Sequence, residues 1–247
     1  MTGWWLDERA HAGDEHLDAT YVSGYDRKAG YDPAEDVEAL RRHGLGPGSS
    51  VVDLGAGTGT FACAVAPECG RVVAVDVSPA MVAALRERVA GLGRDNVTVV
   101  EAGFVSYEHD GEPVDFVFTR NALHQLPDFW KAIALDRIAK LLRPGGVLRL
   151  RDLAYDFEPG EAGERIEAWL AGAVDDPERG YTAGDLALHV RSEFSTWSWL
   201  LDALLDRTGF DVVERSYRRG AYGAYTCVRR AGPGLDSQVG AGPRVRP

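Results

Sequence analysis

The sequence predicts an α/β protein built on a largely parallel sheet with helices on both faces. Short apolar runs, which suit buried strands, alternate with longer segments of helical periodicity. The first run, residues 50–54, leads into a glycine-rich loop, and the second, residues 71–77, is followed by the helix-start pair Ser78-Pro79. Because strand–helix–strand units cross over in the right-handed sense, these strands are expected to run parallel.

Five apolar runs are expected to form the parallel strands: residues 50–54, 71–77, 96–100, 114–119 and 147–150. Helices are expected where apolar residues recur at helical spacing: residues 32–44, 59–68, 78–91 and 129–142. Beyond residue 195 the chain predicts a helix, 196–208, and two strands, 210–217 and 222–228. The turn between these two strands is short, so they are expected to be antiparallel.

The polar stretch before residue 196 interrupts this alternation and suggests an insertion. The predicted organisation is an N-terminal cap (1–34), a cofactor-binding core (35–154), a helical lid insertion (155–195), a C-terminal helix and strands that complete the core (196–230) and a disordered, Gly/Pro-rich tail (231–247).

Composition limits the classes of function. The 247 residues are 45% hydrophobic and carry a formal charge of −11, with a pI of about 5.0. Proteins that grip nucleic acid usually present a basic face, so no nucleic-acid partner is expected. No apolar run is long enough for a membrane span, and no secretory leader is evident. Cys63, Cys69 and Cys227 lack zinc-ligand spacing, so we expect reduced thiols and no bound metal. We further expect a cytoplasmic protein that is a monomer or homodimer.

The loop Gly55-Ala56-Gly57-Thr58-Gly59 carries the clearest functional signal. Its glycines let the backbone approach a ligand closely, and the following helix presents free N–H groups. Dinucleotides and S-adenosylmethionine both bind such loops. A dinucleotide loop needs its third glycine at position 60, where this chain has Thr60. Asp53, just before the loop, would repel a pyrophosphate but suits a cationic ligand.

Asp76 ends the second strand, where its carboxylate can accept hydrogen bonds from two ribose hydroxyls. Val77, beside it, is placed to pack on an adenine face. Together with the loop, these residues favour S-adenosylmethionine over a plain structural turn, and an NAD cofactor stays as the alternative.

Four segments resemble motifs of the class I S-adenosylmethionine-dependent methyltransferases, a Rossmann-like family. They are residues 51–59 (VVDLGAGTG), 73–78 (VAVDVS), 121–128 (NALHQLPD) and 142–146 (LRPGG). The resemblance covers residues 35–153 firmly and the C-terminal strands more loosely. It implies a Rossmann-like, seven-stranded, mostly parallel sheet with an antiparallel last strand, and it implies that Gly55, Gly57 and Asp76 bind the cofactor.

One position departs from the family pattern. The family often has an aspartate after the third strand, which accepts a hydrogen bond from the adenine amine, and here that position is Gly103. The contact is expected to pass to a backbone group or to Glu101, with Phe104 stacked on the ring. The expected cofactor-binding residues are therefore Asp53, Gly55, Ala56, Gly57, Gly59, Asp76, Val77, Gly103, Phe104, Arg120 and Asn121.

Ligands of open α/β sheets bind outside the carboxyl ends of the strands, which places residues 120–125 and 151–152 near the reacting centre. Methyl transfer mainly requires an in-line nucleophile, and a base is needed only if that nucleophile arrives protonated. His124 is the first candidate catalytic base, with Asp152 and His189 behind it. A packing or capping role for His124 and a structural-acceptor role for Asp152 stay open.

Two further segments are candidates for covering the site. Helical spacing puts His189 and Glu193 on one face of residues 185–199, which form either a lid that excludes water or a solvated helix. The tyrosines and basic residues of 21–28 either meet the methionine carboxylate of the cofactor or belong to an ordinary packing helix.

The sequence therefore predicts an S-adenosylmethionine-dependent methyltransferase that acts on a small-molecule acceptor and releases S-adenosylhomocysteine. A neutral or cationic acceptor suits the acidic chain. The alternatives are an NAD-dependent oxidoreductase and a module that binds the cofactor without catalysis. The sequence leaves open the acceptor and whether its nucleophile is O, N, C or S.

Overall fold

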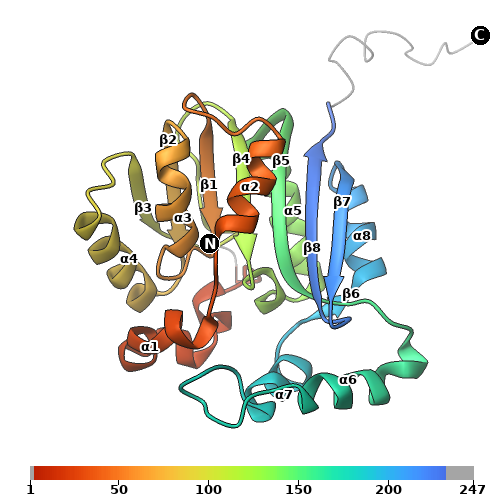
Figure 1. Ribbon diagram of the computed structural model, residues 1–247. Helices are drawn as coiled ribbons and strands as arrows, with labels where there is room; N and C mark the ends of the chain where they lie inside the picture. Colours follow the sequence, from red (N-terminus) through yellow and green to blue (C-terminus); the bar gives the residue numbers. More distant parts are fainter. Residues whose placement is uncertain (1–2, 232–247) are drawn as a thin grey trace, which may run out of the picture.

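The computed structural model describes residues 3–231, and the structural statements below concern these described residues. They form a sheet in the order β3-β2-β1-β4-β5-β8-β7, which Figure 1 shows face-on. Its strands are β1 (Ser50–Leu54), β2 (Arg71–Asp76), β3 (Val97–Glu101), β4 (Val114–Arg120), β5 (Leu142–Tyr155), β7 (Phe210–Arg218) and β8 (Tyr222–Arg229). Residues 232–247 of the expected tail lie outside the described residues.

The strands from β3 to β5 are parallel to their neighbours. The last strand, β8, inserts between β5 and β7 and is antiparallel to both. The expected Rossmann-like sheet with an antiparallel last strand is therefore confirmed.

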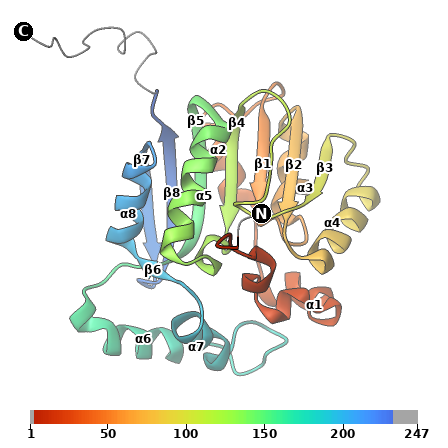
Figure 2. The same cartoon turned by 180° about the vertical axis from the view of Figure 1, so that it is seen from behind.

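Helices cover both faces of this sheet (Figures 1 and 2). They are α1 (Ala19–Ala29), α2 (Ala34–Arg42), α3 (Thr60–Val65), α4 (Pro79–Gly91), α5 (Asp128–Leu141), α6 (Ala162–Ala171), α7 (Ala183–Arg191) and α8 (Ser198–Arg207). One core lies under α2, α3 and α4, and the other lies under α5 and α8. Among the described residues, no helix combines the length and apolarity that a membrane span requires.

Side-chain alternation explains why the strands read as continuous apolar runs. Val52 and Val73 belong to the core under α5 and α8, whereas Val51 and Val72 belong to the core under α2, α3 and α4. Because both faces of a parallel sheet are covered, successive residues of a central strand are buried on opposite sides.

The boundaries of β5 and α8 differ from the sequence expectation. β5 begins at Leu142 rather than Val147 and continues to Tyr155. Leu142 pairs with Val114 of β4, and the regular pairing of the two strands resumes at Val147 and Phe116. The register shift between Val114 and Phe116 accommodates the Pro-Gly-Gly turn between the two parts of β5. The helix expected at residues 196–208 begins at Ser198, because Thr196 and Trp197 form the short strand β6 against β5.

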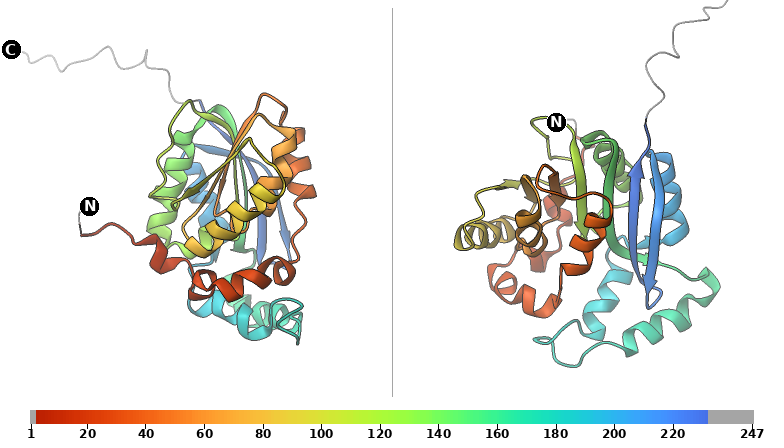
Figure 3. Two further views of the ribbon diagram at one scale, coloured as in Figure 1. Left: turned by 90° about the vertical axis from the view of Figure 1, so that its left-hand side faces the viewer. Right: turned by 45° about the horizontal axis from the view of Figure 1, so that its top comes forward.

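Helices α1, α6 and α7 gather beyond the carboxyl ends of the parallel strands (Figures 1 and 3). Residues 155–195, the expected lid, hold α6 and α7. Lys28 links α1 to the lid segment. Its Nζ lies 3.3 Å from a carboxylate oxygen of Asp185 in α7 and 5.1 Å from the centre of the Tyr181 ring. Lys28 thus faces the lid, while Tyr25 of the same helix lines the central cavity.

Candidate cofactor and active site

The glycine loop is fixed against the end of β2 by backbone hydrogen bonds. The N–H groups of Gly55 and Ala56 both donate to the carbonyl of Val75, at 2.9 Å each. The two carboxylate oxygens of Asp76 accept from the N–H of Gly57 at 2.8 Å and of Ser78 at 2.9 Å. Asp76 therefore ties the loop to the start of α4, and burial raises its pKa while these hydrogen bonds oppose the rise.

Two glycines of the loop are required for different reasons. Gly55 has φ +73°, and a Cβ there would lie 2.4 Å from the Cβ of Ala122, on the segment after β4. Gly59 has φ +84°, and its Cβ would lie 2.1 Å from Cδ1 of Leu85 in α4. Gly55 keeps the wall of the cavity close to β4, whereas Gly59 lets α3 approach α4.

A cavity opens between this loop and the N-terminal segment. Of the predicted cofactor-binding residues, the cavity is lined by Gly55, Gly57, Asp76, Val77, Gly103, Phe104, Arg120 and Asn121. Its remaining lining includes five residues that were not among the predicted site residues: Glu8, His11, His16, Ser78 and Met81. Ser78 and Met81 could have been inferred because they directly follow Asp76, but Glu8, His11 and His16 reach the cavity only through the fold.

A second cavity adjoins the first and shares Tyr25, Gly55, Gly57 and Arg120 with it. Asp53 and Ala56 line this second space. One carboxylate oxygen of Asp53 is buried and has no hydrogen-bond partner among residues 3–231. Burial, followed by the charge of Asp76, raises the pKa of Asp53 well above its usual range. Gly59, the remaining predicted residue, lines neither space.

Glu8 occupies the place left by Gly103. Its carboxylate accepts from the N–H groups of Val105 and Ser106, at 2.9 Å each, and from the Ser106 hydroxyl at 2.7 Å. A side-chain acceptor at position 103 would cap these same two N–H groups from within the turn. Glu101 is exposed and does not line the cavity, so the expectation that it takes over the role of the missing aspartate is not supported by its position.

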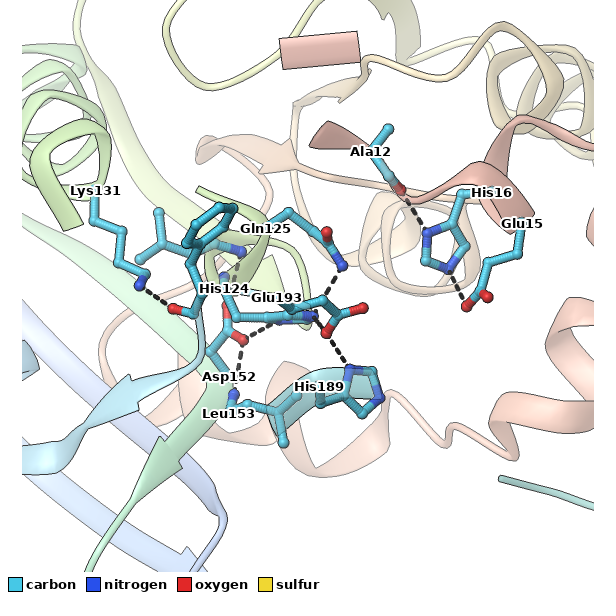
Figure 4. A network of polar contacts seen from close by, with 12 residues as sticks. Ala12, Glu15, His16, His124, Gln125, Lys131, Asp152, Leu153, His189 and Glu193 are labelled. Carbon is cyan, nitrogen blue, oxygen red and sulfur yellow. Dashed lines mark hydrogen bonds and ion pairs between the residues drawn. The ribbon is translucent and has the colours of Figure 1, made fainter. Parts of the chain in front are cut away.

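A polar cluster lies next to Gln125 of the cavity lining, between the core and residues 155–195 (Figure 4). Nδ1 of His124 lies 2.5 Å from Oδ1 of Asp152. Asp152 also accepts from the backbone N–H groups of Leu123, His124 and Leu153, at 2.7, 3.2 and 2.7 Å. Asp152 therefore fixes both the imidazole and the turn that carries it.

The lid completes this cluster. Nε2 of His124 lies 3.2 Å from Oε2 of Glu193, and the same oxygen contacts Nδ1 of His189. Figure 4 shows Glu193 between the two imidazoles. The N–H of Phe194 donates to the carbonyl of His124 at 3.0 Å, which ties the segment after α7 to the core. The structure thus brings the predicted residues His124, Asp152 and His189 together and adds Glu193.

Charge governs the protonation of this cluster. Burial by itself lowers the pKa of His124, but Asp152 and Glu193 outweigh it and raise the pKa to about 9. Burial favours the neutral acids, but His124 lowers the pKa of Asp152, and both imidazoles lower that of Glu193. His124 is buried and does not line the cavity, whereas its neighbour Gln125 does, with Nε2 at 3.2 Å from Nε2 of His124.

Part of the chain is similar in sequence to known methyltransferases. Residues 51–146 match the methyltransferase domain family. The chain is 31% identical over 144 residues to phosphoethanolamine N-methyltransferase 2 of Caenorhabditis elegans, which covers 58% of this chain and 32% of that protein. It is 26% identical over 196 residues to an uncharacterized methyltransferase of Geobacillus kaustophilus, covering 77% of this chain and 82% of the relative.

Solved structures share the fold. A SAM-dependent methyltransferase from Aquifex aeolicus matches 86% of this chain and 98% of its own, with a TM-score of 0.60 and 21% identity. Magnesium protoporphyrin IX methyltransferase from Synechocystis, solved with bound SAM, matches 92% of this chain and all of its own, with a TM-score of 0.62 and 16% identity. The matched domain, the relatives and the fold together support a class I S-adenosylmethionine-dependent methyltransferase.

Proposed function

We propose that this chain transfers the methyl group of S-adenosylmethionine to a small-molecule acceptor. The observation that carries the proposal is the cavity that the glycine loop, Asp76 and Glu8 enclose. The likeness to S-adenosylmethionine-dependent methyltransferases supplies the methyl donor, and the residues of this cavity and of the adjoining one fit the two ends of that donor.

The adenosine end fits the part of the cavity between β2 and β3. The Asp76 carboxylate, already oriented by Gly57 and Ser78, has further lone pairs for two ribose hydroxyls. Val77 and Phe104 offer apolar surface to an adenine ring. Glu8 supplies a carboxylate beside Gly103, where its negative charge suits the adenine amine.

The methionine end fits the adjoining space. The unpartnered oxygen of Asp53 is buried, and in the ionised form of this acid it can accept a hydrogen bond from the α-ammonium group. Arg120 lines both spaces, and its guanidinium lies 4.0 Å from the centre of the Tyr31 ring. Within residues 3–231 that guanidinium enters no ion pair, which leaves it free to hold the carboxylate of the cofactor.

A third cavity is the proposed acceptor side. It lies at the ends of β4, β5 and β8 and shares Arg120 and Asn121 with the cofactor cavity. Tyr181 and Tyr222 line it together with Asp152. These phenols and charges offer hydrogen bonds to a polar acceptor held in line with the methyl group.

We place His124, Asp152 and His189 in this reaction as positioning residues. His124 does not line the cofactor cavity, but Gln125 lines it and contacts His124. Asp152 fixes the turn that carries both residues. The cluster therefore sets the position of Gln125 and the docking of the lid.

The first experiment measures cofactor binding. S-adenosylhomocysteine is titrated into the protein in a calorimeter, with Asp76→Ala as the test variant and Asp95→Asn, at an exposed position in the loop before β3, as the control. Two charge-assisted hydrogen bonds are worth about 3 kcal/mol, so Asp76→Ala should weaken binding about 100-fold. A folded wild-type protein that does not bind would overturn the proposal, and stabilisation by NADH instead would favour the oxidoreductase.

The second experiment measures turnover. Panels of small alcohols, phenols, amines and thiols are incubated with S-adenosylmethionine, and release of S-adenosylhomocysteine is followed. Binding without release in any panel or in a metabolite extract would favour the non-catalytic module.

The acceptor is proposed to be a small molecule rather than a nucleic acid because the chain carries a net charge of −11. The buried free thiols Cys63, Cys69 and Cys227 support a reducing, cytoplasmic setting. The proposed oligomeric state is a monomer or a homodimer, which the molar mass measured by sedimentation equilibrium tests.

A further inference from the structure

We propose that His124, His189 and Glu193 form a binding site for a divalent transition-metal ion of the Zn²⁺ class, with Asp152 orienting His124. The ligand atoms of the three residues lie within 4.8 Å of one another. No bound metal was expected from the sequence, because no cysteines or histidines have zinc-ligand spacing along the chain. These three residues come together only in the fold.

The chemistry of the donor set favours such an ion. Two imidazoles and one carboxylate are the three protein ligands of many zinc sites that keep one position open. Ligand atoms of a tetrahedral site with bonds of about 2.1 Å lie roughly 3.4 Å apart. The 3.2 Å between Nε2 of His124 and Oε2 of Glu193 is close to this spacing, whereas the contact between His189 and Glu193 is shorter and would open when an ion binds. Mg²⁺ prefers oxygen ligands and is disfavoured here.

The polar groups around His124 suit a cation. Its Nδ1 faces Asp152 and therefore carries a proton. Its Nε2 faces both the Glu193 carboxylate and the Gln125 amide, at 3.2 Å each. A metal ion between His124 and Glu193 would bind the lone pair of this nitrogen and the carboxylate oxygen together.

Asp152 provides the outer support that metal-ligating histidines need. A ligating imidazole usually donates its other N–H to a carboxylate, which fixes the tautomer and the ring orientation. Asp152 holds Nδ1 of His124 in this manner and is itself fixed by three backbone N–H groups. Nε2 is thereby aimed at the lid.

The site faces the cofactor cavity through Gln125. Its amide, turned about the last side-chain bond, would present its oxygen to the ion as a fourth ligand. An acceptor hydroxyl or thiol that displaced this oxygen would bind the ion beside the methyl donor. This role rests on the proposed methyl transfer, but the metal site itself does not.

The test uses the full chain after removal of adventitious metal. Co²⁺ is titrated while visible absorption reports its coordination geometry, and Zn²⁺ binding is measured by calorimetry. We expect one equivalent per chain, roughly micromolar or tighter affinity, tetrahedral Co²⁺ bands and no competition by Mg²⁺. His189→Ala and Glu193→Gln, both on the partly exposed lid, should each weaken binding at least tenfold.

His109→Ala is the matched control, because His109 pairs with Tyr107 outside the cluster. It should bind Co²⁺ like the wild type. A folded protein that takes up no Co²⁺, or affinity unchanged in both lid variants, would overturn the metal site. S-adenosylhomocysteine binding is measured on the same samples, so failure of the metal site and failure of the cofactor site are told apart.

Discussion

The carboxylate of Glu8 lies where a side chain at Gly103 would begin: a Cβ on Gly103 would be 2.4 Å from the carboxyl carbon of Glu8. An N-terminal residue thus caps the turn after β3 from outside, and its carboxylate lines the proposed cofactor cavity. The two positions share one space, so only one of them can carry the acid.

This relationship predicts a rescue. Glu8→Ala should lower the free energy of unfolding by about 2 kcal/mol, because the buried N–H groups that Glu8 accepts from lose their hydrogen-bond partner. The same variant should weaken S-adenosylhomocysteine binding about tenfold. Gly103→Asp alone should also destabilise the protein, since the two acids collide. The double variant should recover stability and binding, because an aspartate at position 103 can cap Val105 and Ser106 itself. If the losses of unfolding free energy of the two single variants, measured with urea, simply added up in the double variant, the two side chains would not occupy the same space.

Gly55→Ala should impair both folding and cofactor binding. The new methyl group would meet Ala122 at 2.4 Å and sits at φ +73°. Gly93→Ala is the control, because Gly93 also has positive φ, at +58°, but faces open space. The control should cost about 1 kcal/mol through backbone strain alone, and Gly55→Ala should cost more. Adding Ala122→Gly should restore part of the binding measured by calorimetry; no recovery would mean that strain alone accounts for the loss.

Cofactor affinity should depend on pH through Asp53. The pKa of this buried acid is raised in the free protein, so it holds a proton at pH values where an exposed aspartate is ionised. The ionised form is the one that binds an ammonium group. S-adenosylhomocysteine binding should therefore release protons and tighten as pH rises through the raised pKa.

Calorimetry in buffers of different ionisation enthalpy measures this proton release. Asp53→Asn keeps the side-chain shape and should bind more weakly, without the pH dependence. Proton uptake on binding, or an unchanged pH profile in this variant, would show that Asp53 does not meet the ammonium group.

Asp36 should be the most costly acid of the N-terminal region to remove. It is fully buried in α2 and accepts hydrogen bonds from Arg149 and Arg151, both at 2.9 Å, and from the Tyr31 hydroxyl at 2.8 Å. Asp36→Ala would leave the buried Arg149 charge unpaired, at a cost of about 3–5 kcal/mol. Glu35→Ala, which removes an exposed ion pair with Arg151, should cost less than about 1 kcal/mol. Urea unfolding at constant m-value compares the two, and equal losses would contradict this ranking.

The sequence alone determined the sheet and predicted the centre of the cofactor site. Strand runs, the glycine loop and Asp76 are local patterns, because a buried parallel strand, a tight loop and a helix cap each require particular residues within a few positions. The starts of β5 and α8 were misplaced because pairing with β4 and β5 overrode the local turn signals.

Only the tertiary structure decided which distant residues share a space. Glu8 meets the turn after β3, and His189 and Glu193 of the lid meet His124 and Asp152 of the core. No spacing rule links these residues, since their approach depends on how the cap and the lid fold over the sheet edge. The sequence named His124 as a candidate base, and the fold placed the buried carboxylate of Asp152 on one side of its ring, the half-buried carboxylate of Glu193 on the other and Gln125 beside it in the cavity lining. Local chemistry can be read from the order of residues, whereas a site built from separate segments exists only once packing has brought them together.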